Sequence, residues 1–311
     1  MTVRSFGARL AEEFSAGRHL CAGIDPHAPL LAEWGLADDA AGAERMGREV
    51  VAASAGIAAC VKPQISFFER FGSAGFLALE RVLADARAAG LLVVGDVKRG
   101  DIGSTFAAYA DAWLAPGSPL EVDAMTVAAY MGFGTLSGAF PYVRDHGKGL
   151  FVLAATSNPE AREVQAARRA DGSTLAAAMV ADAEAFNAAA FGDEAVGSVG
   201  VVLGATLDLA TFGIETAGSP RRSSWRRRCP CSPPASGRRE PGSRTRGRSS
   251  GASAAHCSRT SRAAFSRADQ RAWRNACAPV RRRSPPRWPT RRDPPPPGVP
   301  RARPTQYIRG R

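Results

Sequence analysis

Short apolar runs alternate with longer amphipathic stretches between residues 19 and 206 of the chain. The apolar runs are rich in Val, Ile, Leu and Ala, and each ends in glycine or a polar residue, which is typical of buried strands. The intervening stretches carry Ala, Leu, Glu and Arg in helix-like patterns. Strands are expected at 19–25, 57–64, 91–98, 121–127, 149–157 and 198–206. Helices are expected up to about residue 55 and at 73–89, 104–113, 134–145 and 160–191.

Strands that alternate with helices predict a parallel sheet covered by helices. Two architectures are compatible with six such units: a doubly wound sheet, or a barrel that lacks two units. The first strand is followed by Gly23-Ile24-Asp25-Pro26-His27, which has none of the GxGxxG spacing of a dinucleotide-binding turn. Polar residues instead recur at the strand ends, as Asp25, Lys62, Asp96, Lys98, Thr126, Thr156, Ser157 and Thr206. A polar ring on one face favours an α/β fold of the (β/α)8 TIM-barrel class, with about six units recognisable.

The segment 91–105, LLVVGDVKRGDIGST, contains a dense group of charged residues. An apolar run ends in four charged residues within six positions. Alternation along an extended chain should point Asp96 and Lys98 to one side and Val97 into apolar packing on the other. The alternative is a solvated turn with incidental ion pairs.

Lysine is rare in this chain. The only three are Lys62, Lys98 and Lys148, whereas Arg is common, so Arg is used wherever any cation suffices. Two of the three lysines end predicted strands. Lysine can give up a proton and arginine cannot, which indicates that these two positions require an ammonium group. The alternative is that they are ordinary lysines whose stems cover apolar surface.

The net charge of +12 is the sum of two segments with opposite charge. Residues 1–220 hold 16 Lys+Arg and 26 Asp+Glu, a net of −10, and residues 221–311 hold 25 Arg and 3 acids, a net of +22. The second part has 14 of the 22 prolines and no leucine, so it has little to bury and is expected to be disordered. We therefore divide the chain into 1–217, an incomplete barrel domain, and an Arg/Pro-rich segment, 218–311.

Three interpretations of the Arg/Pro-rich segment compete. Runs such as Arg226-Arg227-Arg228 would attract nucleic-acid phosphates. Pro294 to Pro297 would suit a linker or a ligand of proline-binding domains. The third is a GC-rich gene read in a shifted frame, which we favour because a selected basic arm usually mixes Lys with Arg.

The cellular location is predicted from the cysteines and from the absence of long apolar runs. Cys21 and Cys60 lie in apolar runs and are expected to be buried thiols in a reducing cytosol. No run approaches eighteen apolar residues, and the first residues carry acids where a signal peptide needs an apolar core. A cytoplasmic, soluble protein without a membrane partner is expected.

The segment 96–105, DVKRGDIGST, and Val61-Lys62-Pro63-Gln64 together resemble orotidine 5'-phosphate decarboxylases. The resemblance is closest to the longer bacterial branch and covers about residues 5–215. Further similar runs are 23–27, Phe67-Phe68-Glu69 and 155–159. It implies a homodimer with sites at the interface, orotidine 5'-phosphate as the substrate, and no metal or organic cofactor.

The resemblance also implies roles for individual residues. The alternating catalytic array falls on Lys62, Asp96, Lys98 and Asp101, with Asp101 reaching into the partner's site. The substrate-binding positions are Asp25 and Thr105 for ribose hydroxyls, Ser157 for the pyrimidine ring, and Ile102 beside them. Asp101 and Thr105 would act across the dimer interface, and Arg99 is assigned no chemical step.

Such chemistry has a clear physical requirement. Loss of CO2 from C6 of orotate leaves a carbanion that no adjacent π system delocalises. A preorganised ammonium at that carbon, in a site closed to water, stabilises charge where it develops. Lys98 would fill this role and deliver the proton.

The sequence departs from the family after the sixth strand. A P-G-x-G-x-Q-G-G-like loop and the phosphate-binding arginine of the last strand are not recognisable, so we expect no measurable decarboxylation from the chain as written. Two other functions stay open. A Mg2+-dependent keto-sugar-phosphate decarboxylase of the same superfamily would place a carboxylate where this chain has Lys62. A nucleic-acid-binding protein would act through the basic segment, and a barrel without activity is a third possibility.

Overall fold

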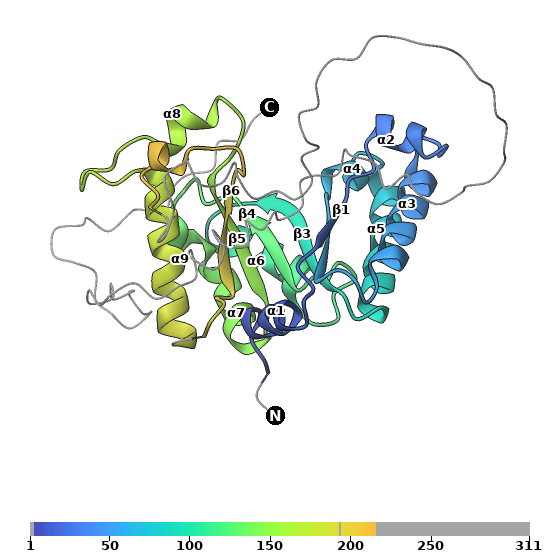
Figure 1. Ribbon diagram of the computed structural model, residues 1–311, viewed down its shortest axis with the longest axis horizontal. Helices are drawn as coiled ribbons and strands as arrows, with labels where there is room; N and C mark the ends of the chain where they lie inside the picture. The colour runs from blue at the N-terminus through green and yellow to red at the C-terminus, as the bar shows by residue number, and fades with distance from the viewer. Residues whose placement is uncertain (1–2, 193, 216–311) are drawn as a thin grey trace, which may run out of the picture. The chain divides into compact units, whose positions relative to one another are not determined.

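Six parallel strands form one curved sheet in the computed structural model (Figure 1), which describes residues 3–192 and 194–215. Each strand pairs with the next one along the chain, so the spatial order is the sequence order. The strands are β1 (Cys21–Ile24), β2 (Cys60–Pro63), β3 (Leu92–Arg99), β4 (Ala124–Val127), β5 (Gly149–Ala155) and β6 (Val199–Leu203). All six predicted strands are therefore confirmed; five are shorter than predicted, and β3 has the predicted length but is shifted by one residue.

Helices follow the strands and cover the outer face of the sheet (Figure 1). Helix α5 shows the pattern that causes this: it buries Ala78, Leu79, Val82, Leu83 and Ala86, which recur every three to four residues along one face. The helices are α1 (Phe6–Ser15), α2 (Ala28–Glu33), α3 (Ala40–Ser54), α4 (Ser66–Glu69), α5 (Gly72–Ala88), α6 (Gly103–Leu114), α7 (Phe140–Asp145), α8 (Ala161–Gln165) and α9 (Leu175–Phe191), with the 3-10 helices η1 (Phe133–Ala139) and η2 (Leu209–Phe212).

Sequential parallel pairing with alternating helices is the arrangement of a (β/α)8 barrel, and the six described strands correspond to its first six units. The fold class predicted from the sequence is confirmed. The expected Arg/Pro-rich segment, and anything that would supply a seventh and an eighth strand, lie outside the described residues.

Two predicted helices differ from the structure. The helix expected at 134–145 begins as the 3-10 helix η1 and becomes α-helical only at Phe140. The helix expected at 160–191 is two helices, because a turn at Asp171-Gly172 separates α8 from α9. The Asp171 carboxylate accepts hydrogen bonds from the backbone N–H and the hydroxyl of Ser173, which favours this turn over a continuous helix.

The inner face of the sheet has an apolar floor. Cys21, Cys60, Val94 and Phe151 point to this face, and α1 packs beneath them. Cys21 and Cys60 are partners in the β1–β2 register, and both are buried free thiols, as the sequence predicts. The floor lies toward the amino-terminal ends of the strands, where α1 crosses them (Figure 1).

The next inward positions along the same strands are polar. Because side chains alternate between the faces of a strand, the residue two positions after Cys60 is Lys62, and the residue two after Val94 is Asp96. Asp25 follows Cys21 by four residues and continues the same inward set. The sheet therefore carries charged groups directly above an apolar layer, at the carboxyl ends of its strands.

Among residues 3–192 and 194–215, no helix is long and apolar enough to cross a membrane.

Truncation of Phe6 should reveal how much the floor contributes to stability. Its ring is 1% exposed and meets Phe151 edge-on, with ring centroids 6.0 Å apart. We expect Phe6→Ala to lower the free energy of unfolding by about 3 kcal/mol, since it removes a buried ring and leaves a cavity. Urea denaturation measures this. Val3→Ala, at a 58% exposed position nearby, is the control and should change it by less than about 0.5 kcal/mol. Equal effects of the two substitutions would contradict the floor's role.

Candidate active site

The carboxyl end of β3 presents two charged side chains to the inner face. Lys98 Nζ donates a hydrogen bond to Asp96 Oδ1 at 2.6 Å, while Val97 between them is buried in the outer core and 3% exposed. The predicted orientation of these three residues is therefore confirmed. The Asp96 side chain is 10% exposed, and the Lys98 side chain is 44% exposed. Lys98 can consequently meet a bound molecule, whereas Asp96 lies beneath it.

Lys62, from the neighbouring strand β2, holds the other oxygen of the same carboxylate. Its Nζ lies 3.0 Å from Asp96 Oδ2. Burial alone would raise the pKa of Asp96, but Lys62 and Lys98 outweigh it and lower that pKa below its usual value. Burial would likewise lower the pKa of Lys62, but the charges of Asp96 and Asp25 raise it overall. Asp96 and Lys62 thus stabilise each other's charged forms.

Asp25 completes a four-residue arrangement that we call the charged cluster: Asp25, Lys62, Asp96 and Lys98. Asp25 follows β1 directly, and its pKa is raised, chiefly by burial and against the attraction of Lys62. Two carboxylates and two ammonium groups give the cluster no net charge. Of the polar strand-end residues expected on one rim, Lys62, Asp96 and Lys98 are joined by ion pairs, and the charge of Asp25 acts on Lys62.

Two further side chains, Gln64 and Thr126, contact the cluster. Thr126 was counted among the polar strand ends and Gln64 belongs to the 61–64 run, but neither was predicted as a site residue. Lys98 Nζ donates to Gln64 Oε1 at 3.2 Å, and the Thr126 hydroxyl donates to Asp96 Oδ1 at 2.9 Å. The sequence does place both near the site, because Gln64 follows Lys62 by two residues and Thr126 is the next-to-last residue of β4. Which member of the charged cluster each would contact depends on the register between strands, which the sequence pattern does not contain.

The backbone at Lys98 is unusual. Its φ of 50° makes it the only non-glycine residue with positive φ in the described part of the chain. The pairing of β3 with β4 shifts at this point: four residue steps from Gly95 to Arg99 face only two from Met125 to Val127. The two extra residues on β3 bend the strand and re-aim its side chains. Such strain persists only where surrounding contacts hold it, and it concentrates at functional sites.

Arg99 points away from the charged cluster. Its guanidinium donates to Glu69 at 2.6 Å and to the Val97 carbonyl at 3.0 Å, and it lies over the ring of Tyr109. Arg99 belongs to the 96–105 motif and Glu69 to the Phe67-Phe68-Glu69 run, so this ion pair joins two of the runs that carry the family resemblance. Arg99 thus connects the end of β3 to α4.

Gly100 allows the loops after β3 and β4 to touch. A Cβ atom at this position would lie 2.0 Å from the Ala128 carbonyl oxygen, far inside any real contact. Only glycine fits there without displacing the backbone. The glycine of the 96–105 motif therefore keeps the next residue, Asp101, at a fixed place beside the end of β4.

Four of the predicted site residues do not join the charged cluster. Asp101 accepts a hydrogen bond from the backbone N–H of Ile102 at 2.7 Å and forms no ion pair with any residue in the described ranges. Ile102 is 57% exposed, and Thr105 is exposed on the first turn of α6. Ser157 is exposed after β5, beside Gly204 at the end of β6.

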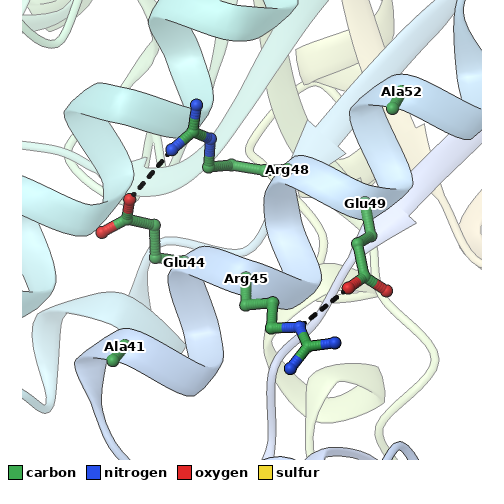
Figure 2. Close-up of a pocket in the computed structure, with 6 residues that line it drawn as sticks. All are labelled: Ala41, Glu44, Arg45, Arg48, Glu49 and Ala52. Carbon is green, nitrogen blue, oxygen red and sulfur yellow. Dashed lines mark hydrogen bonds and ion pairs between the residues drawn. The ribbon is translucent and has the colours of Figure 1, made fainter.

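A hollow of about 460 Å3 lies elsewhere, on the outer face of α3 (Figure 2). Its charged lining is paired within the helix, Arg45 with Glu49 at 2.9 Å and Arg48 with Glu44 at 3.3 Å. These are i,i+4 pairs of an exposed helix surface, worth a few tenths of a kcal/mol each. This hollow contains no member of the charged cluster, and we assign it no chemistry.

Acidic and amine side chains at the carboxyl ends of parallel strands define the class: this is a (β/α)8-barrel enzyme fold with its site on the loop face. A family model described as orotidine 5'-phosphate decarboxylase / HUMPS family matches residues 18–221. The chain belongs to this family.

Curated relatives agree with the family assignment. An orotidine 5'-phosphate decarboxylase of Streptomyces coelicolor is 55% identical over 217 residues, which cover 70% of this chain and 77% of the relative. One of Corynebacterium efficiens is 51% identical over 205 residues, covering 66% and 73%.

Solved structures show the same likeness. A protein of Streptomyces avermitilis described as an orotidine 5'-phosphate decarboxylase is 55% identical, with a TM-score of 0.65 and coverage of 68% of this chain and 74% of the other. The OMP decarboxylase of Leishmania donovani is 34% identical, with a TM-score of 0.54 and coverage of 66% and 73%. The fold of the described strands is thus that of this family.

The lowered pKa of Asp96 predicts a pH dependence of stability. Between the folded and unfolded pKa values the unfolded chain binds more protons, so the contribution of Asp96 is fully present above about pH 4 and is lost as pH falls through the folded pKa. Asp96→Asn should therefore flatten the acid side of the stability profile measured by urea denaturation. At pH 7 it should cost about 3 kcal/mol, because two ammonium groups lose their partner.

Asp145→Asn, at an exposed position of α7, is the matched control and should leave the profile unchanged. If Asp96→Asn and the control gave the same acid slope, the paired state of Asp96 would be refuted.

Proposed function

We propose that this chain is a carboxy-lyase that converts orotidine 5'-phosphate into uridine 5'-phosphate and CO2, the last step of UMP biosynthesis. The observation that carries the proposal is the Asp96 carboxylate held between two ammonium groups, one of them half exposed at the rim of the sheet. The family membership and the names of the 50–55% identical relatives support it.

Lys98 is the residue to which we assign the chemical step. The bond between C6 and the carboxylate carbon breaks, its electron pair remains on C6, and CO2 departs. The Lys98 ammonium stabilises this charge as it develops and then transfers a proton to C6, after which solvent reprotonates the amine. A fixed charge needs no reorganisation during the reaction, which makes this the largest favourable effect available.

Asp96 and Lys62 prepare Lys98 for this step. The carboxylate of Asp96 aims the Lys98 amine through their hydrogen bond. It would lie close to the substrate carboxylate, which raises the energy of the bound substrate relative to the carbanion. Lys62 holds the second oxygen of Asp96. Asp25, at the end of β1, suits a ribose hydroxyl as a hydrogen-bond acceptor. Ser157, after β5, would bind the pyrimidine ring.

We also propose that the enzyme is a homodimer, with Asp101 and Thr105 reaching the partner's site and Ile102 packing beside them. Exposed apolar side chains support this: Ile102 is 57% exposed, Tyr130 87% and Met131 47%. They follow β3 and β4, whose ends are joined by the pairing of Arg99 with Val127. A second copy of this chain would cover them and would bring its own Asp101 toward Lys98.

We propose a cytoplasmic location, supported by the free buried thiols Cys21 and Cys60. We further propose 1–217 as the catalytic domain. The prediction that the chain as written lacks turnover concerns residues beyond 215, outside the described ranges, and it stays a prediction.

Turnover should be measured on two proteins. One is the full chain, and the other carries residues 1–217 followed by the C-terminal segment of the Streptomyces coelicolor relative, which restores the phosphate-binding loops of the family. We expect the chimera to consume orotidine 5'-phosphate, as followed by the loss of orotate absorbance. Lys98→Ala should lower its kcat at least about 1000-fold.

Arg45→Ala removes a 69% exposed cation from α3 and is the matched control, with kcat expected to be unchanged. A folded chimera without turnover, or one that keeps its turnover after Lys98→Ala, would refute the assignment. Turnover by the full chain would support the function and would show that the predicted impairment is wrong.

The dimer proposal has a separate test. Tyr130→Asp should shift the sedimentation coefficient toward that of a monomer, because a charge in an apolar interface is costly. Ile57→Asp, at a 64% exposed position before β2, is the control and should leave the association unchanged. A monomeric parent protein, or dimers that tolerate Tyr130→Asp, would contradict the proposed interface.

A further inference from the structure

Thr126 connects the two features that set the charged cluster apart: the buried carboxylate and the strained backbone. Its side chain is on β4 and the residue is 4% exposed. Its hydroxyl donates to Asp96 Oδ1 at 2.9 Å, and it accepts the backbone N–H of Lys98, also at 2.9 Å. One buried oxygen therefore touches both residues that flank Val97.

The direction of these two bonds is fixed by chemistry. A backbone N–H can only donate, so the hydroxyl oxygen must accept from Lys98. An ionised carboxylate can only accept, so the single hydroxyl proton must point to Asp96. Both capacities of the hydroxyl are thus committed, and it has one arrangement available while Asp96 is charged.

Where β3 gains two residues relative to β4, the backbone N–H of Lys98 donates to the hydroxyl of Thr126. An unpaired N–H at this depth would cost free energy comparable to a lost hydrogen bond. Thr126 therefore stabilises the positive φ that aims the Lys98 amine.

We propose that Thr126 is a positioning residue for decarboxylation, which holds Lys98 and Asp96 in their reactive geometry without touching the substrate. The proposal rests on the proposed function. Without the hydroxyl, the Lys98 backbone can relax toward ordinary negative φ, and its amine moves away from Asp96 and from the place where C6 would lie. Displacements of about 1 Å in such a site cost roughly 100-fold in rate.

The rarity of lysine gives a direct test on the full chain. Only Lys62, Lys98 and Lys148 can be acetylated, apart from the chain's amino terminus, so mass spectrometry can follow each amine separately. Thr126→Val keeps the shape of the side chain and removes both bonds, and we expect it to raise the acetylation rate of Lys98 about tenfold. Lys148, which is buried and paired with Glu121, serves as the internal reference.

Two further variants separate positioning from general loosening. Thr126→Ser keeps the hydroxyl and should bring the Lys98 rate back to within about twofold of the parent. Thr174→Val removes a hydroxyl that is as buried as that of Thr126 and also makes two hydrogen bonds. Thr174 is 4% exposed, its hydroxyl accepts from the Ala177 N–H, and it donates to the Phe212 carbonyl. The substitution should lower the melting temperature and leave the Lys98 rate unchanged.

The kinetic counterpart uses any form of the enzyme that turns over. Thr126→Val should lower kcat roughly 100-fold with KM within about threefold, and Thr126→Ser should restore most of kcat. A Lys98 acetylation rate that does not respond to Thr126→Val, or that Thr174→Val raises equally, would overturn the inference. Absence of turnover in every protein would refute the proposed function instead, and the acetylation result would still stand by itself.

Discussion

The site depends on one buried carboxylate with an ammonium group on each oxygen. Removing Asp96 from water is costly, and Lys62 at 3.0 Å and Lys98 at 2.6 Å make it favourable for the carboxylate to stay charged there. The dependence is mutual, because partial burial would by itself lower the pKa of Lys62, and the charges of Asp96 and Asp25 raise it overall. No member of the charged cluster can be lost without leaving an uncompensated charge beside an apolar floor.

Regular strand alternation and parallel pairing account for most of this geometry. Alternation along each strand places Lys62 and Asp96 above the apolar residues Cys60 and Val94, and parallel pairing brings the strand ends to one level. The departure from regularity at the site is the extra length of β3 opposite β4, which lifts Lys98 over Asp96. The third lysine, Lys148, is placed differently: it is buried and paired with Glu121 at the opposite ends of the strands.

Much of this could be predicted from the sequence, because it follows from local periodicity. The two-residue alternation in 91–98 is sufficient to place Asp96 and Lys98 together and Val97 apart, and the recurrence of polar strand ends indicates a barrel. What the pattern lacks is register. The contacts of Gln64 and Thr126 with the charged cluster, and that of Glu69 with Arg99, join residues about 30 positions apart and follow from how far each strand runs. The break between α8 and α9 was missed for a different reason, since one Asp-Gly turn outweighed a long helix-favouring composition.

The order in which the strands pair has a consequence for biosynthesis. Every strand joins its predecessor, so no β-sheet partner in residues 3–192 and 194–215 has to wait for a segment synthesised much later. All the side chains that surround Asp96 are contributed by β1 to β4, which end at Val127. The charged cluster can therefore assemble while the ribosome is still translating the second half of the message. A nascent chain that has emerged as far as the end of β4 contains every member of the cluster together with Thr126.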